Sequence, residues 1–151
     1  MQKLNQKSST TIHGSEALDK IINRLKSTDD PKKRYEYVLW LAKKLPPMSK
    51  DLQNENVKVK GCISQVYVLG NIVNGKIQWQ GYSDALITKG LLSLLILGLN
   101  DLTPEETIQI DPSFISETGL SNSLTPSRAN GFLNILLSMK SQAQKLKMQS
   151  S

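Results

Sequence analysis

The sequence is poor in the side chains that most catalytic sites need. Its 151 residues include one cysteine, Cys62, and one histidine, His13. A lone histidine in a polar N-terminal segment argues against a Ser-His-Asp triad, and one cysteine with one histidine cannot supply a zinc site. A single cysteine cannot form an internal disulfide either. We therefore expect no bound metal, and a reducing, cytoplasmic setting.

Membrane spans and nucleotide-binding loops are also missing. The longest apolar run, residues 90–99, includes Ser93 and is much shorter than the roughly 20 residues of a membrane span. The glycines lack the spacing of phosphate-binding loops, and the polar N-terminus lacks the apolar region of a secretory signal. We expect no membrane association and no cofactor held by this chain.

Positive charge is unevenly distributed along the chain. The net charge of +6 lies in residues 1–60, whereas residues 61–151 are neutral overall. A basic surface suits an acidic protein or a nucleic acid, although we favour an ordinary solvated helix face. Aromatic residues are few and do not alternate with the basic ones, which argues against nucleic acid.

The hydrophobic pattern predicts a single α+β domain. Apolar residues at helical spacing predict N-terminal helices over 15–27 and 31–45, a central helix over 83–99 that is apolar nearly all round, and a C-terminal helix over 125–143. Between them, alternating residues predict a small antiparallel sheet of about three strands that packs against these helices. We expect residues 15–143 to form the domain, with flexible tails at 1–14 and 144–151.

Two local signals sharpen this prediction. Asn74-Gly75 between β-rich runs predicts a two-residue hairpin turn, because both positions need positive φ. Gly131 within the last helix lowers helix propensity by about 1 kcal/mol relative to alanine. We expect close packing of Gly131 against the central helix or the sheet to compensate for that loss.

Cys62 is the residue with the clearest chemical potential. A lone cysteine is usually a small buried apolar residue. Cys62, however, follows Gly61 at the junction of a polar connection and a strand, where glycine permits unusual backbone angles. Lys58 and Lys60 precede it, and nearby positive charge favours a reactive thiolate, although solvated lysines are the commoner case.

Several spaced blocks resemble the signature of the SufE-like sulfur-acceptor proteins. These blocks are Val59-Lys60-Gly61-Cys62-Ile63-Ser64-Gln65-Val66, Gln80-Gly81-Tyr82-Ser83-Asp84-Ala85, Lys89-Gly90, and Leu124-Thr125-Pro126-Ser127-Arg128 with Gly131. The resemblance runs from about residue 16 to residue 143. Ile63 and Tyr82 depart from it, where more polar residues are expected.

The resemblance implies a function in iron–sulfur cluster assembly. The cysteine matching Cys62 takes persulfide sulfur from a SufS-type, PLP-dependent cysteine desulfurase, stimulates that enzyme and passes sulfur to a scaffold or another acceptor. The PLP belongs to the partner. The implied role is that of a sulfurtransferase-type accessory protein and not of an independent enzyme.

Other residues are expected to support Cys62 or to contact the partner. The resemblance places Arg128 and Asp84 near the cysteine loop, and Gly61, Ser64 and Gln65 lie within its motif. Arg128 and the helix N-terminus would add positive charge beside the thiolate. A salt bridge for Arg128, helix capping for Asp84 and a plain strand-surface position for Gln65 are the structural alternatives.

A second function class remains open from the residues alone. The chain could be a non-catalytic adaptor whose basic N-terminal helices bind a protein partner while Cys62 is an inert structural residue. Binding of RNA or DNA through the same charge is a weaker third reading. Sulfur uptake on Cys62 separates the first class from the other two.

Overall fold

The fold consists of helices on both sides of one central helix, with a two-stranded hairpin beside it. The computed structural model describes residues 11–150. In chain order, the elements are α2 (Glu16–Lys26), α3 (Pro31–Ala42), η1 (Lys50–Leu52), η2 (Glu55–Val57), β1 (Val66–Val73), β2 (Lys76–Ser83), α4 (Leu86–Leu99), α5 (Pro104–Ile108), α6 (Phe114–Glu117), η3 (Leu120–Asn122) and α7 (Pro126–Ser150). The predicted α+β class is confirmed.

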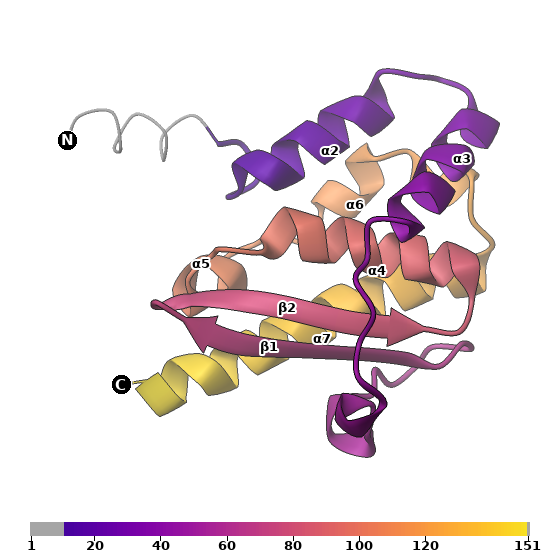
Figure 1. Cartoon of the computed structure of the whole chain (residues 1–151). Coiled ribbons are helices and arrows are strands. Elements are labelled where there is room, and N and C mark those ends of the chain that lie inside the picture. The colour runs from indigo at the N-terminus through magenta and orange to yellow at the C-terminus, as the bar shows by residue number, and fades with distance from the viewer. Residues whose placement is uncertain (1–10, 151) are drawn as a thin grey trace.

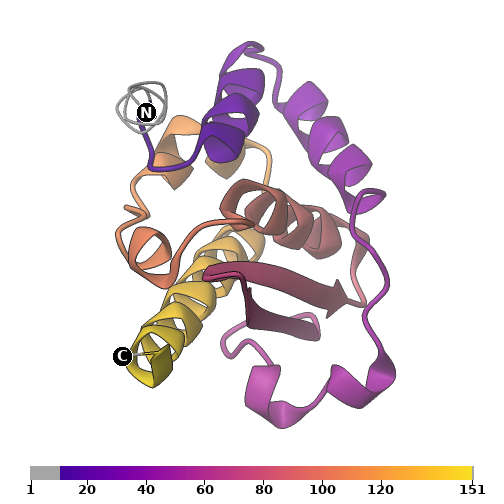
Figure 2. The ribbon, with the colours of Figure 1, turned by 60° about the vertical axis from the view of Figure 1, so that its left-hand side comes forward.

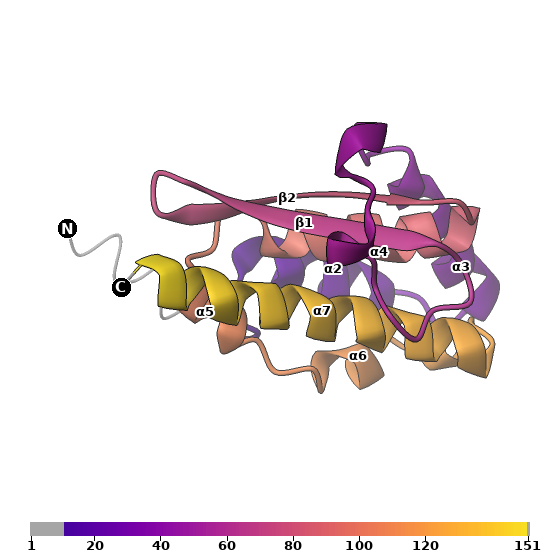
Figure 3. The ribbon, with the colours of Figure 1, turned by 90° about the horizontal axis from the view of Figure 1, so that it is seen from below.

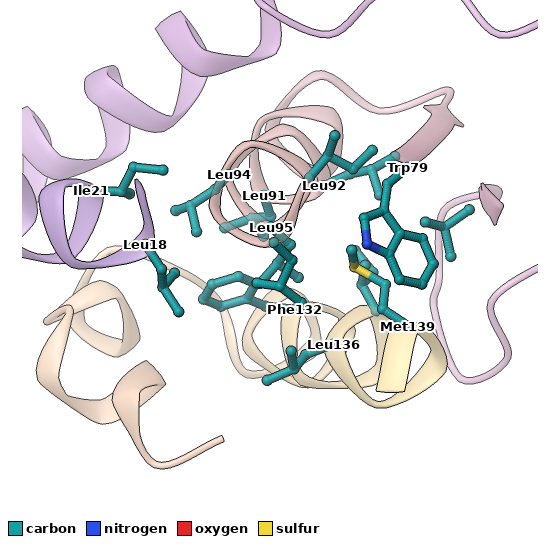
Figure 4. Close-up of a cluster of buried hydrophobic side chains, with 14 of the residues drawn as sticks. Leu18, Ile21, Trp79, Leu91, Leu92, Leu94, Leu95, Phe132, Leu136 and Met139 are labelled. Atoms are coloured by element: carbon teal, nitrogen blue, oxygen red, sulfur yellow. The ribbon is translucent and has the colours of Figure 1, made fainter. Parts of the chain in front are cut away.

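Helix α4 lies at the centre because it is apolar on every side. It packs against α2 and α3 on one side, and against β2 and α7 on the other (Figures 1 and 2). A helix with no polar face gains most by being surrounded. Figure 4 shows the resulting core, in which leucines of α4 meet side chains of α2, β2 and α7. The labelled members are Leu18, Ile21, Trp79, Leu91, Leu92, Leu94, Leu95, Phe132, Leu136 and Met139.

The hairpin has two strands and not about three. Strands β1 and β2 pair from Val66 opposite Ser83 to Val73 opposite Lys76, and Asn74 and Gly75 form the predicted turn with φ values of 54° and 79°. The expected first strand is reduced to an isolated bridge between Lys58 and Tyr67. The chain forms the η2 turn just before this bridge and leaves extended geometry soon after it, which limits the pairing.

Helix α7 runs alongside β1 and covers its open edge (Figure 3). The Gln142 amide accepts a hydrogen bond from Gly70 N at 3.1 Å and donates one to Val68 O at 2.7 Å. An unpaired strand edge is otherwise open to association with another strand. The side chain of Gln142 therefore serves as a substitute for the missing third strand.

The two expected tails have different outcomes. Helix α7 continues to Ser150, so residues 144–150 are helical where a tail was expected, and their flexibility stays a prediction. Of the expected tail at 1–14, residues 1–10 lie outside the described part, and His13 is bonded to Asp19 of α2 at 2.7 Å. Within residues 11–150, no helix is long and apolar enough to cross a membrane.

Candidate functional site

Cys62 lies in a short loop that leaves and rejoins the fold at almost the same point. Val59 N donates a hydrogen bond to Val66 O at 2.8 Å, which closes the loop at its base. Both valines are buried. Residues 60–65 therefore project from an anchored base just before strand β1 begins.

Gly61 gives the loop its sharp turn. Its φ is +82°, a conformation that other residues adopt only with strain. A Cβ atom there would lie 2.6 Å from Asn134 Nδ2 of helix α7, well inside contact distance. The same Asn134 amide donates a hydrogen bond to Gly61 O at 3.0 Å. The torsion favours glycine at this position, and a larger residue would also have to displace the Asn134 amide that holds the loop.

Arg128 joins the loop to two helices. It belongs to the first turn of α7, and its Nη1 donates to Ser64 Oγ in the loop at 2.5 Å and to Thr88 Oγ1 of α4 at 2.6 Å. Thr88 is buried. Hydrogen bonds from a charged group are among the stronger ones in proteins, so Arg128 fixes the position of Ser64 beside Cys62.

Asp84 holds the far end of the loop and does not cap α4. Its Oδ1 accepts a hydrogen bond from Gln65 N at 3.0 Å, and Asp84 N donates to Gln65 O at 3.3 Å. The N-cap of α4 is Ala85, which has no side-chain capping bond. The structural alternative for Asp84, helix capping, is therefore wrong. Gln65 takes part through its backbone, while its side chain is exposed.

The thiol of Cys62 is turned inward. The residue is half-buried and packs against the hydrophobic core. Its Sγ lies 3.7 Å from Gly131 O of α7, within reach of a weak S–H donation. A Cβ atom at Gly131 would meet only this sulfur, at an ordinary van der Waals distance of 3.6 Å. The expected close packing of Gly131 against the central helix or the sheet is therefore wrong, and its neighbour is the cysteine.

Burial raises the pKa of the Cys62 thiol, and the positive charge of Arg128 lowers it by a smaller amount. The cation that acts on the sulfur is Arg128 and not the two lysines considered from the sequence. Lys58 pairs with Glu55 at 3.9 Å, and Lys60 is exposed. Neighbouring charge therefore does favour the thiolate, but it comes from Arg128, and desolvation outweighs it in the resting protein.

One large apolar side chain beside Cys62 faces solvent. Ile63, the next residue, is 79% exposed. The rest of the loop is polar or glycine, and Lys60 and Gln65 are exposed as well. Within residues 11–150, no group of three or more histidine, cysteine, aspartate or glutamate side chains is placed to hold a metal ion.

A family comparison decides what this arrangement belongs to. Residues 19–143 match the family model described as SufE: Fe-S metabolism associated domain. The chain belongs to the SufE family. The predicted resemblance is thereby confirmed, and family membership gives the chain a role in iron–sulfur metabolism.

Curated SufE relatives support the assignment. The chain is 52% identical to an uncharacterized SufE-like protein of Synechocystis over 83% of this chain and 79% of that protein. It is 42% identical to the cysteine desulfuration protein SufE of Plasmodium vivax and 36% identical to SufE-like protein 1, chloroplastic/mitochondrial, of Arabidopsis thaliana. These matches cover 74% and 87% of this chain but only 46% and 36% of the relatives, so the chain spans less than half of each.

The SufE fold is also shared with a solved structure. The solution structure of a hypothetical protein from Thermus thermophilus superposes with a TM-score of 0.75 at 26% identity. The match covers 87% of this chain and 96% of the other. Helices and hairpin of this kind therefore recur together as one fold.

The structure brings the expected SufE site residues together and adds two that the sequence did not single out. Gly61, Ser64 and Gln65 form the loop around Cys62, with Arg128 and Asp84 bonded to it. The additional residues are Asn134 and Thr88. A buried hydroxyl in the mostly apolar central helix is a signal for Thr88, but Ser93 shares it. Nothing in the sequence marks Asn134, because its partner is a backbone carbonyl distant in the chain.

Proposed function

We propose that Cys62 accepts a sulfur atom as a persulfide from a PLP-dependent cysteine desulfurase and passes it on for iron–sulfur cluster assembly. The observation that carries the proposal is the placement of the chain's single thiol. Cys62 is half-buried within a loop that is held by hydrogen bonds from Arg128, Asp84 and Asn134. A purely structural cysteine needs no such loop around it.

Relatives point in the same direction. The Plasmodium vivax protein is named a cysteine desulfuration protein, and the family model is described by Fe–S metabolism. A desulfurating partner leaves sulfur on a thiol, and a second thiol is needed to remove it. Cys62 is the only thiol that this chain can offer.

The transfer is a displacement at sulfur. The Cys62 thiolate attacks the outer sulfur of the donor's cysteine persulfide, the donor's S–S bond breaks, and the donor cysteine leaves as a thiolate. Cys62 then carries the new S–S bond and the outer sulfur. The proton lost from Cys62 balances the proton taken up by the departing thiolate, so no external oxidant or reductant is needed.

Arg128 is proposed to assist this step through charge. The pKa of Cys62 is raised at rest by burial, so the thiol is protonated and poorly reactive until a partner docks. Contact with the donor at exposed Ile63 would draw the loop outward, which reduces burial while Arg128 remains bonded to Ser64. The thiolate becomes available where the donor sulfur is present. The same shelter would slow loss of the cargo to small thiols.

The test is sulfur loading followed by mass. The protein is mixed with a PLP-dependent cysteine desulfurase and cysteine, and its intact mass is measured without reductant. We expect a gain of one sulfur atom that thiol treatment removes and that Cys62→Ser lacks. Cysteine turnover by the desulfurase should rise with the parent protein and not with Cys62→Ser.

The adaptor alternative makes the opposite prediction. If Cys62 is only structural, the protein binds the desulfurase without gaining mass, and Cys62→Ser stimulates the enzyme as well as the parent does. That outcome would overturn the persulfide proposal and leave partner binding as the function.

A further inference from the structure

A groove between α2 and α3 combines aromatic walls with a basic rim. Both helices lie on the far side of α4 from the hairpin (Figures 1 and 2). The groove has a volume of about 870 Å³, and its lining includes Lys20, Arg24, Lys33, Tyr37 and Trp40. It is formed by elements other than the loop, α4 and α7 segments that surround Cys62.

The aromatic part of the groove is open to solvent. Tyr37 and Trp40 stack with ring centroids 5.8 Å apart and planes 20° apart. Trp40 is 47% exposed, whereas Trp79, the other tryptophan, is 5% exposed in the core. A tryptophan that leaves this much apolar surface in water is typical of a binding surface, because covering it releases water from a large ring.

The charges around the rings are mainly positive. Arg24 lies over the Tyr37 ring at 5.5 Å, and Lys44 lies over the Trp40 ring at 4.7 Å. Lys20 and Lys33 add two further cations to the rim. The lining contains a single carboxylate, that of Glu36. The groove therefore favours a ligand that is anionic and carries an apolar group.

We propose that this groove binds an acidic segment of a partner protein, with an apolar side chain seated against Tyr37 and Trp40 and carboxylates facing Arg24, Lys20 and Lys33. Four cations of the N-terminal part of the chain lie around this aromatic pair: Lys20, Arg24, Lys33 and Lys44. This binding does not involve Cys62, and it gives the chain a second point of contact with a partner.

A peptide fits the groove better than a nucleic acid does. Bases bind single-strand sites by stacking on free aromatic faces. Tyr37 and Trp40 already stack on each other, and each also lies beside a cation. A base would have to displace one of those neighbours. An aliphatic side chain can contact the exposed ring edges without displacing either neighbour, and carboxylates of the peptide can pair with the cations.

The test uses a synthetic twelve-residue peptide with glutamates flanking a central leucine pair. Binding is followed by the two indole N–H signals of the ¹⁵N-labelled protein, with buried Trp79 as the internal reference for exposed Trp40. We expect the Trp40 signal to shift on titration while that of Trp79 stays in place. Raising the salt concentration should weaken binding several-fold, since exposed charges are screened.

Variants locate the site. Trp40→Ala should weaken binding about tenfold or more, and Lys33→Glu, which changes only an exposed charge, about three- to fivefold. Lys145→Glu on α7 makes the same charge change away from the groove and should leave affinity unchanged. Two matched peptides, one with lysine for glutamate and one with serine for leucine, should bind at least about fivefold more weakly.

Three results would overturn the proposal. The first is the absence of a Trp40 shift at millimolar peptide, and the second is equal weakening of binding by Lys33→Glu and Lys145→Glu. The third is tighter binding of a dodecameric oligothymidylate than of the acidic peptide, with both followed by the Trp40 indole signal. The last result would assign the groove to nucleic acid. None of them depends on whether Cys62 carries sulfur.

Discussion

Two glycines, one in the hairpin turn and one in the loop before the hairpin, have nearly the same backbone conformation but different surroundings. Gly75 in the β1–β2 turn has φ +79°, and Gly61 beside Cys62 has φ +82°. A Cβ at Gly75 would meet nothing within 4 Å, whereas one at Gly61 would lie 2.6 Å from Asn134. The turn at Gly75 is determined by its own two residues. The loop at Gly61 is determined also by helices that lie far away in the sequence.

This difference separates a connection from a site. A two-residue turn only has to reverse the chain, and Asn74-Gly75 does so without help. The Cys62 loop has to hold one sulfur at one depth. Three side chains from α7 and the β2–α4 junction therefore bond to it: Arg128, Asn134 and Asp84.

The largest difference in stability is expected when the same methyl group is placed at both glycines. Gly61→Ala combines a strained torsion with a clash and should cost about 2–3 kcal/mol of unfolding free energy. Gly75→Ala has the torsion strain alone and should cost about 1 kcal/mol. Urea unfolding measures both. Sulfur loading of Cys62 should fall sharply in Gly61→Ala and stay at the parent level in Gly75→Ala.

A double variant tests the cause of the larger cost. Removing the Asn134 amide by Asn134→Ala relieves the clash with an alanine at position 61. The pair Gly61→Ala with Asn134→Ala should therefore be less destabilised than the sum of the two single variants. Strict additivity would show that α7 does not constrain the loop at Gly61.

Removing Arg128 should have the next largest effect, on reactivity. Arg128→Ala deletes the charge that lowers the pKa of Cys62 and leaves burial unopposed, so this pKa should rise further. Loading at neutral pH should fall roughly fivefold to tenfold. Arg128→Lys retains the charge but not the planar Nη1 group that bonds to both Ser64 and Thr88, so its loading rate should lie between those of the parent and Arg128→Ala. The measurement is the loading rate as a function of pH, whose midpoint should move upward in Arg128→Ala. An unchanged rate and midpoint would remove Arg128 from the mechanism.

Local patterns in the sequence were enough to predict most of the fold. The apolar central helix and the Asn74-Gly75 turn both appear where their residues indicate. Each depends on neighbours in the chain. The prediction of a third strand was wrong, because the chain around Gly61 turns away to form the cysteine loop. The predicted end of the last helix was wrong too, because helix α7 continues to Ser150.

The candidate site was predictable in its residues but not in its contacts. The motif resemblance singled out Cys62, Arg128 and Asp84. The burial of the sulfur, and with it the upward shift of the Cys62 pKa, depends on contacts with Gly131 O and the core. The spacing of residues in the sequence does not predict these contacts. The capping alternative for Asp84 was wrong for the same reason. An aspartate before a helix usually caps it, and only the path of the preceding loop gives it another partner.

A smaller effect is expected where the loop rejoins the hairpin. Asp84→Ala removes the acceptor for Gln65 N and should cost about 1 kcal/mol of unfolding free energy. Asp84→Asn retains an oxygen at that position and should cost less. Amide hydrogen exchange should become faster at Gln65 in Asp84→Ala and remain unchanged at Gly75. Equal exchange rates at Gln65 in parent and variant would contradict a role of Asp84 in holding the loop.

The smallest expected effect contrasts the pH dependence of stability with that of loading. The ring of His13 faces two carboxylates, with Nδ1 2.7 Å from Asp19 Oδ1 and Nε2 3.0 Å from Glu117 Oε2, and the protonated ring donates to both. Burial lowers the pKa of His13, but the hydrogen bonds and charges of Glu117 and Asp19 raise it above 6.5 overall. A raised pKa means that this contact stabilises the fold fully below pH 6.5 and is lost as the pH rises through the folded pKa. The melting temperature should therefore fall by about 2 °C or less between about pH 6 and pH 8, while sulfur loading rises over the same range as Cys62 deprotonates. His13→Gln should reduce the pH dependence of the melting temperature and leave the pH dependence of sulfur loading unchanged. A change in both would mean that the His13 contact and the Cys62 site are coupled.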